Sequence, residues 1–154
     1  MKEQPAFTLN ERLARDCHTL ADLELSRLLL MNNALLPWFI LVPRVEAVEL
    51  HELTPPQQSQ LLEEINLLSR FLQRHFSPDK LNVAAIGNVV RQLHIHLVAR
   101  RRDDLCWPGV VWGEQRRTAY DQPSLDRIAR RLRRFLPSRS RYYEAVAKPC
   151  DETP

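Results

Sequence analysis

The sequence contains very little glycine. Only Gly87, Gly109 and Gly113 occur among its 154 residues. A Rossmann fingerprint and a P-loop each need several glycines near the start of a helix, because the backbone there must approach a pyrophosphate closely. No part of the chain has that glycine spacing, so both of these nucleotide-binding motifs are excluded.

Cysteine is also scarce, and long apolar runs are missing. Cys17, Cys106 and Cys150 form no CxxC pair, and an odd number of cysteines suits a reducing compartment better than a disulfide scaffold. The longest apolar runs are strand-sized, well short of the roughly 18 residues that cross a bilayer. The N-terminus has no apolar region of the kind found in a signal peptide. We therefore expect a cytoplasmic protein with no membrane segment.

The charge is small overall but unevenly distributed. The net charge is +3, whereas residues 116–141 contain nine arginines and only two acids, Asp121 and Asp126. A solvated helix face is the favoured interpretation of this segment. A surface that attracts nucleotides or nucleic acid is the alternative.

The apolar pattern predicts an α+β domain. Hydrophobic residues make up 44% of the chain, which is enough for a core. Thr54 and two following prolines predict a helix start, and an apolar stripe with a 3.6-residue period continues to about His75. The other predicted elements are a short helix over 10–16, strands over 26–31, 38–42, 81–86 and 92–98, and a last helix from Ser124. This order favours an antiparallel sheet of about five strands covered by the long helix.

The strand over 92–98 carries the candidate chemistry. His94 and His96 alternate with Leu93, Ile95 and Leu97, so a period of two places both histidines on one face. Such a pair can be structural, can bind a metal, or can transfer a phosphoryl group. A closed metal site needs about four ligands, and no motif spacing supplies the others. In phosphoryl transfer, one imidazole attacks phosphorus and the second assists the leaving group.

Residues 92–98, which read Gln-Leu-His-Ile-His-Leu-Val, resemble the HxHxHxx signature of the histidine triad (HIT) family, with Gln92 in the first position. The flanking segments 29–32, 39–44, 51–53 and 107–109 are similar to family segments in the same order. The resemblance covers roughly residues 17–113. It implies a HIT-like domain over 1–113 and a C-terminal helical extension over 114–154 packed on it.

The resemblance also implies an activity and a site. The family hydrolyses or transfers nucleotides through a covalent nucleotidyl-histidine, without an essential metal or other cofactor, and as a homodimer. The implied substrates are nucleoside phosphoramidates, dinucleoside polyphosphates or similar nucleotide conjugates. His94 would be the nucleophile, His96 would contact the leaving-group oxygen, and Gln92 would complete the triad. The remaining residues expected to contact the nucleotide are Asn32 at the ribose, Asn82 and Asn88 at the phosphate, and Trp107 stacked on the base.

Three positions depart from the family pattern. Gln92 can donate a hydrogen bond but cannot titrate. Val89 lacks the hydroxyl that many members have there, and Trp38 replaces a further histidine that supports the site in several branches. These departures leave a second hypothesis open, a nucleotide-binding module with little or no catalysis.

Overall fold

The structure, a computed structural model, describes residues 6–150 and contains six β-strands and three α-helices in that range. In chain order the elements are α1 (Glu11–Asp16), β1 (Cys17–Asp22), β2 (Ser26–Met31), β3 (Trp38–Pro43), the 3-10 helix η1 (Leu50–Glu52), α2 (Pro55–Phe76), β4 (Lys80–Ala84), β5 (Ile95–Arg100), α3 (Gln122–Phe135) and β6 (Arg141–Tyr142). The strands form one sheet in the order β4-β5-β3-β2-β1-β6, and all neighbouring pairs run antiparallel. The predicted α+β class is confirmed.

The long helix α2 forms where the sequence predicts it. Thr54 and Gln57 make a reciprocal capping box, and prolines occupy the first turn, where a missing N–H costs nothing. Leu68 and Leu72 lie on its buried stripe, and Ser77 ends the helix in the left-handed region with a φ of 45°. Within residues 6–150 no helix is both long enough and apolar enough to cross a bilayer.

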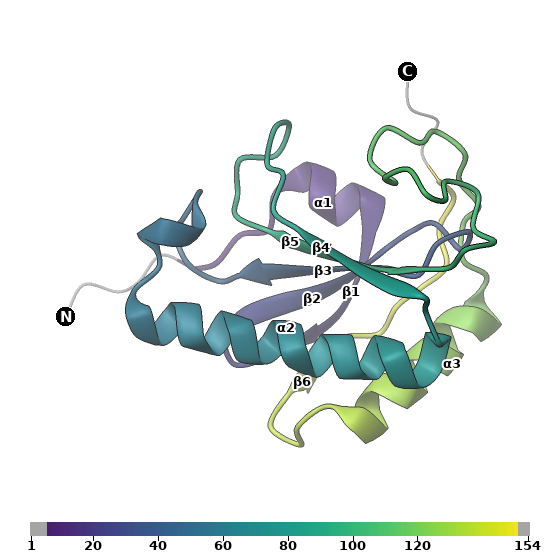
Figure 1. Cartoon of the computed structure of the whole chain (residues 1–154). Coiled ribbons are helices and arrows are strands. Elements are labelled where there is room, and N and C mark those ends of the chain that lie inside the picture. Colours follow the sequence, from purple (N-terminus) through teal and green to yellow (C-terminus); the bar gives the residue numbers. More distant parts are fainter. Residues whose placement is uncertain (1–5, 151–154) are drawn as a thin grey trace.

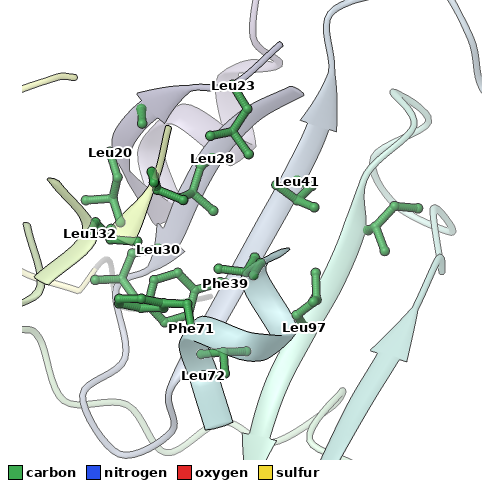
Figure 2. Close-up of a cluster of buried hydrophobic side chains, with 14 of the residues drawn as sticks. Leu20, Leu23, Leu28, Leu30, Phe39, Leu41, Phe71, Leu72, Leu97 and Leu132 are labelled. Carbon is green, nitrogen blue, oxygen red and sulfur yellow. The ribbon is translucent and has the colours of Figure 1, made fainter. Parts of the chain in front are cut away.

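The main core lies between the sheet and two helices. In Figure 1, α2 and α3 cover one face of the sheet, and α1 lies on the opposite face. Phe71 of α2 and Leu132 of α3 pack against Leu30 and Phe39 of the sheet (Figure 2). The rings of Phe39 and Phe71 meet edge to face with centroids 5.9 Å apart, an arrangement that aromatic pairs prefer. This packing fixes which side of each strand points away from the helices.

A second, smaller core lies on the opposite face, beside α1. Its buried members are Leu13, Cys17, Leu29, Leu36, Trp38, Ile40, Val42, Val90, Val98 and Val111. They come from α1, from β1, β2, β3 and β5, from the β2–β3 loop, and from the loops on either side of β5. Because both faces are covered, every side chain of β3 and β5 is buried.

Residues 114–150 fold onto the same sheet. Leu125, Ile128 and Leu132 of α3 enter the main core, and β6 pairs with β1. The segment therefore contributes both core and sheet. The division between residues 113 and 114 stays a prediction.

The sheet differs from the prediction at β6 and β1, which lie at one end of it, and at the signature strand. β6 was not predicted because two residues carry no detectable periodicity. β1 forms where the apolar pattern was mixed. β5 begins at Ile95 and not at Gln92, because the Leu93 N–H donates to Ala47 and the Gln92 carbonyl faces the His94 ring. Neither group is free to join the ladder.

Candidate active site

His94 lies just before β5 and is held by a backbone group. Its Nδ1 is 2.7 Å from the carbonyl oxygen of Gln92. A carbonyl only accepts hydrogen bonds, so Nδ1 carries the proton and Nε2 keeps its lone pair. Nε2 has no hydrogen-bond partner within the described part of the chain. The ring is therefore oriented, with a nucleophilic nitrogen left available.

His96 lies beside His94, with ring centroids 4.8 Å apart. The predicted alternation is confirmed, because Leu93 and Leu97 enter the main core on the other face. The Nε1–H of Trp38 donates to Nδ1 of His96 over 2.9 Å. Burial, with a smaller contribution from the charge of His94, lowers the pKa of His96 to about 3. His96 is therefore neutral at physiological pH.

A pocket of about 330 Å³ opens at the two histidines, a volume within the range of small-molecule sites. Its apolar wall consists of Leu13, Met31, Leu36, Trp38, Ile86, Val89, Val90, Val111 and Trp112. Trp38 and Trp112 meet edge to face at 5.9 Å. Charged side chains of both signs, Arg12, Asp16, Glu114 and Arg117, also line the pocket. It can enclose an apolar ring and still present a phosphorus centre to His94.

A smaller cavity of about 120 Å³ adjoins this pocket. The two share residues 86–88 and His94, and the smaller one adds Glu49 and Arg91. His94 therefore stands where the two spaces meet. A substrate can extend from the histidine in two directions.

Gln92 lies next to His94, but its side-chain amide is occupied by backbone groups. Its Oε1 accepts from the Asn10 N–H at 2.9 Å, and its Nε2 donates to the Thr8 carbonyl at 3.0 Å. Gln92 also lines the smaller cavity, and its expected part in the catalytic triad stays a prediction. Its carbonyl orients His94, and its amide holds the segment that leads into α1.

Asn32 is placed away from the pocket. Its Oδ1 accepts from Tyr120 N and lies 3.1 Å from His18 Nε2, while its Nδ2 donates to the carbonyls of Lys148 and Pro149. Every polar atom of this buried side chain is thus used inside the fold. In this structure Asn32 has structural contacts and the neighbouring Asn33 lines the pocket, and the expected contact of Asn32 with ribose stays a prediction.

Asn82 and Trp107 also lie outside the pocket. The Oδ1 of Asn82 accepts from the buried guanidinium of Arg100 at 2.8 Å, and Asp104 accepts from the same guanidinium at 2.7 Å. The Trp107 ring lies under this guanidinium, 5.7 Å from it. In this structure both side chains satisfy a buried cation, and the expected phosphate contact of Asn82 and base stacking of Trp107 stay predictions.

Asn88 is the predicted nucleotide contact that the structure does place beside the histidines. It is exposed and lines both cavities. The N–H groups of Gly87, Asn88 and Val89 donate to no other group within residues 6–150. Gly87 adopts a φ of +67°, which L side chains rarely take up. This loop therefore presents unpaired donors beside His94.

Several pocket residues escaped sequence reasoning. Trp38 was expected only as the replacement of a supporting histidine, and its hydrogen bond to His96 was not predicted. The β3–β5 register, which pairs Trp38 with Val98 and Ile40 with His96, brings the indole to His96, and this register is known only from the structure. Arg12 and Leu13 come from α1, and nothing in the sequence links that helix to the histidine strand.

The part of the chain that the structure describes contains no cluster of side chains that would support metal binding. No group of three or more His, Cys, Asp or Glu side chains could hold an ion there. His94 and His96 have the Gln92 carbonyl and an indole as their nearest hydrogen-bond partners, and both of their Nδ1 atoms are used.

Comparison with known proteins gives a consistent result. The chain is similar to the structure of a histidine triad protein from Bradyrhizobium japonicum, with 44% identity over 85% of this chain and 98% of that one and a TM-score of 0.82. It is similar at 44% identity to a histidine triad protein from Marinobacter aquaeolei, covering 85% and 96% of the two chains with a TM-score of 0.81. A histidine triad protein from Sinorhizobium meliloti shares 41% identity over 84% and 97%, with a TM-score of 0.81. No curated protein matches the chain.

The family model described as HIT domain matches residues 12–103, from α1 to the turn after β5. This range contains the sheet from β1 to β5, the helix α2 and both histidines. The chain therefore belongs to the HIT domain family.

Proposed function

We propose that this protein is a nucleotide-phosphate hydrolase or nucleotidyl transferase that forms a covalent nucleotidyl intermediate on His94. The observation that carries the proposal is the hydrogen bond between His94 Nδ1 and the Gln92 carbonyl, at the point where the two cavities meet. It leaves Nε2 as a lone-pair nucleophile without the need for a general base.

The first chemical step would form a bond between His94 Nε2 and phosphorus and break the bond between phosphorus and the leaving group. The electron pair of the broken bond departs with the leaving group. The ring of His94 then carries the positive charge, and the Gln92 carbonyl accepts its Nδ1–H. Attack by water, or by another acceptor, would then form a new bond to phosphorus and break the Nε2–P bond with its electron pair on Nε2. The proton of the attacking group would pass to solvent.

The 86–90 loop supports the proposal through its unpaired donors. The non-bridging oxygens gain charge in the transition state, and preorganised N–H groups stabilise such charge strongly. Gly87, Asn88 and Val89 offer backbone N–H groups of this kind next to His94. The lack of a hydroxyl at Val89 removes one side-chain donor but none of these backbone donors.

The larger pocket suits a nucleoside. Its walls are mostly aliphatic and indole groups, which pack against a base without reading a particular hydrogen-bond pattern. The polar atoms of Asn33 are already bonded to the backbone of Leu35, Arg116 and Thr118. Nucleoside phosphoramidates, dinucleoside polyphosphates and similar nucleotide conjugates are therefore the substrates to test first.

The direct experiment is to incubate the protein with adenosine phosphoramidate and with diadenosine polyphosphates, and to map any adduct by mass spectrometry. We expect turnover of at least one of these substrates and a nucleotidyl group on His94, both of which are lost in His94→Ala. His51→Ala is the matched control, because His51 is exposed on η1 and lines neither cavity. Equal turnover by His94→Ala would disprove the assignment. Nucleotide binding without any product would favour the non-catalytic module.

A homodimer accompanies this proposal. β4 is an edge strand whose outer side is unpaired in the described chain. Val83 on this strand is 47% exposed, and Ile86 in the loop that follows it is 43% exposed. An open edge with apolar side chains is a typical site for pairing with another chain. Light scattering should give twice the 18.1 kDa of one chain, and a mass of one chain would contradict the proposal.

Nucleic-acid binding along α3 is a second candidate. Arg127, Arg130, Arg133 and Arg134 are exposed, while the apolar stripe of the same helix is buried. Binding to phosphates would weaken steeply as salt is raised. Absent or salt-insensitive binding to DNA and RNA would remove this candidate.

A further inference from the structure

The contact between Trp38 and His96 determines where His96 carries its proton. An indole N–H donates and never accepts, so the Nδ1 that receives it must hold a lone pair. The remaining ring proton of the neutral imidazole then lies on Nε2. The indole of Trp38 can only donate this hydrogen bond, whereas a histidine in the same place could either donate or accept it.

The surroundings of His96 keep the ring uncharged. Its side chain is 6% exposed, and the edge of Trp112 packs against it with ring centroids 5.5 Å apart. His94 is the titratable group in ring contact with it. The charged groups that line the same pocket are Arg12 and Asp16 of α1 and Glu114 and Arg117 of the loop after β5. Two cations and two anions oppose each other there, so the pocket adds no net charge that would draw a proton to His96.

A neutral His96 with its proton on Nε2 can assist a leaving group only as a hydrogen-bond donor. To transfer that proton it would have to become an imidazolate, because its Nδ1 has no second proton to replace the loss. An imidazolate is much more basic than the groups that leave phosphorus readily. The leaving group must therefore depart without a proton from this residue.

We propose that Trp38 holds His96 as a neutral Nε2–H donor, so that the site favours substrates whose leaving group departs as an anion, such as phosphate, polyphosphate or carboxylate, over substrates that release an amine. The proposal rests on the function proposed above. The step balances without proton transfer: the Nε2–P bond of His94 forms, the P–O bond breaks with its electron pair on oxygen, and His96 donates a hydrogen bond to that oxygen. An amine cannot leave in this way, because its nitrogen must first be protonated.

The first test reads the tautomer and needs no substrate. In ¹⁵N NMR spectra of the full-length protein, His96 should show a protonated Nε2 and an unprotonated Nδ1 across neutral and mildly acidic pH. Trp38→Phe removes the donor and keeps an aromatic ring, so His96 should lose this fixed tautomer and titrate at higher pH. Trp107→Phe is the matched control, because that ring lies under Arg100 outside the pocket. A wild-type spectrum with Nδ1 protonated would overturn the proposal even if the variant did not fold.

The second test compares leaving groups on one nucleoside. Adenosine 5′-aryl phosphodiesters made from phenols of increasing pKa should lose kcat/KM steeply in the wild type. Adenosine phosphoramidate should turn over at least ~100-fold more slowly than the most reactive ester, which is the lower end of a general-acid contribution. In Trp38→Phe the gap should narrow and a pH dependence should appear. A phosphoramidate that reacts as fast as the best ester would overturn the proposal. Loss of all turnover would overturn the proposed function, whereas the NMR result would still decide the tautomer.

Discussion

The side-chain oxygen of Gln92 accepts a hydrogen bond from the backbone N–H of Asn10 over 2.9 Å, across 82 residues of sequence. With the bond from its amide nitrogen to Thr8, Gln92 holds the segment that enters α1. α1 in turn supplies Arg12, Leu13 and Asp16 to the pocket. Gln92, at the first signature position, therefore holds α1 in place as one wall of the pocket.

Replacing Gln92 by alanine should weaken nucleotide binding more than it slows chemistry. The variant loses two hydrogen bonds worth about 1 kcal/mol each but keeps the backbone carbonyl that orients His94. We expect KM to rise roughly tenfold, while kcat stays within about twofold. Steady-state kinetics measures both constants, and Gln73→Ala, at an exposed position of α2, is the control. If kcat fell while KM stayed unchanged, the result would contradict this prediction and support a direct catalytic role for Gln92.

Replacing Asn32 by alanine should destabilise the fold and leave nucleotide affinity unchanged. The substitution strands the Tyr120 N–H and the buried His18 ring and releases two carbonyls of the C-terminal segment. Buried groups without partners cost about 1–3 kcal/mol each, so we expect a loss of roughly 3 kcal/mol in urea unfolding. Asn88→Ala should do the reverse and weaken binding at unchanged stability. If Asn32→Ala lost nucleotide affinity without losing stability, the result would contradict this prediction and support a contact of Asn32 with ribose.

Stability should decline as the pH falls, and His96 should account for much of the decline. Burial and His94 lower the pKa of His96 from 6.5 to about 3. Below pH ~6.5 the unfolded chain binds a proton that the folded chain refuses. The stabilisation from the neutral ring is therefore complete above that pH and is lost as the pH approaches the folded pKa. At about 1.4 kcal/mol per pKa unit, the full effect is roughly 5 kcal/mol.

Urea unfolding of the wild type and of His96→Gln at a series of pH values measures this effect. The difference in unfolding free energy between the two proteins should shrink steadily on acidification. Burial also lowers the pKa of His18, so part of the decline should persist in the variant. Parallel curves for the two proteins would contradict the assignment to His96.

Glu64 should be among the most sensitive positions of α2. Its buried carboxylate accepts from the N–H groups of Leu25 and Ser26 at 2.7 and 3.1 Å, in the turn between β1 and β2. Glu64→Ala leaves both donors unpaired, and we expect a loss of about 2–4 kcal/mol. Glu63→Ala, at the exposed neighbouring position, should change stability by less than about 0.5 kcal/mol. Equal effects of the two substitutions in thermal or urea unfolding would show that the turn does not depend on Glu64.

Burial also raises the pKa of Glu64 above 4.5, so its ionisation works against stability as the pH rises through the folded pKa. Glu64→Gln keeps an acceptor but cannot ionise. The variant should therefore not lose stability as the pH rises. This loss runs in the opposite direction to that from His96, which appears as the pH falls.

Local sequence patterns predicted the helices and strands that depend on residues within one short segment. The capping residues and apolar stripe of α2 were sufficient, since helix formation depends on contacts a few residues apart. The alternation around His94 and His96 likewise fixed their common face. The contacts of Asn32, Asn82 and Trp107 could not be predicted in this way, because folding brings their partners to them from distant parts of the chain.

The sequence by itself determined the family signature, the α+β class and the pair of histidines on one strand face, because periodicity and spacing are local properties. Only the tertiary structure decided how that pair is used. The register of β3 against β5 brings Trp38 to His96, and the long-range bonds of Gln92 bring α1 to the pocket. The hydrogen-bond partner of each histidine decides which ring nitrogen carries the proton. For His96 that partner, Trp38, is in place only when distant segments meet.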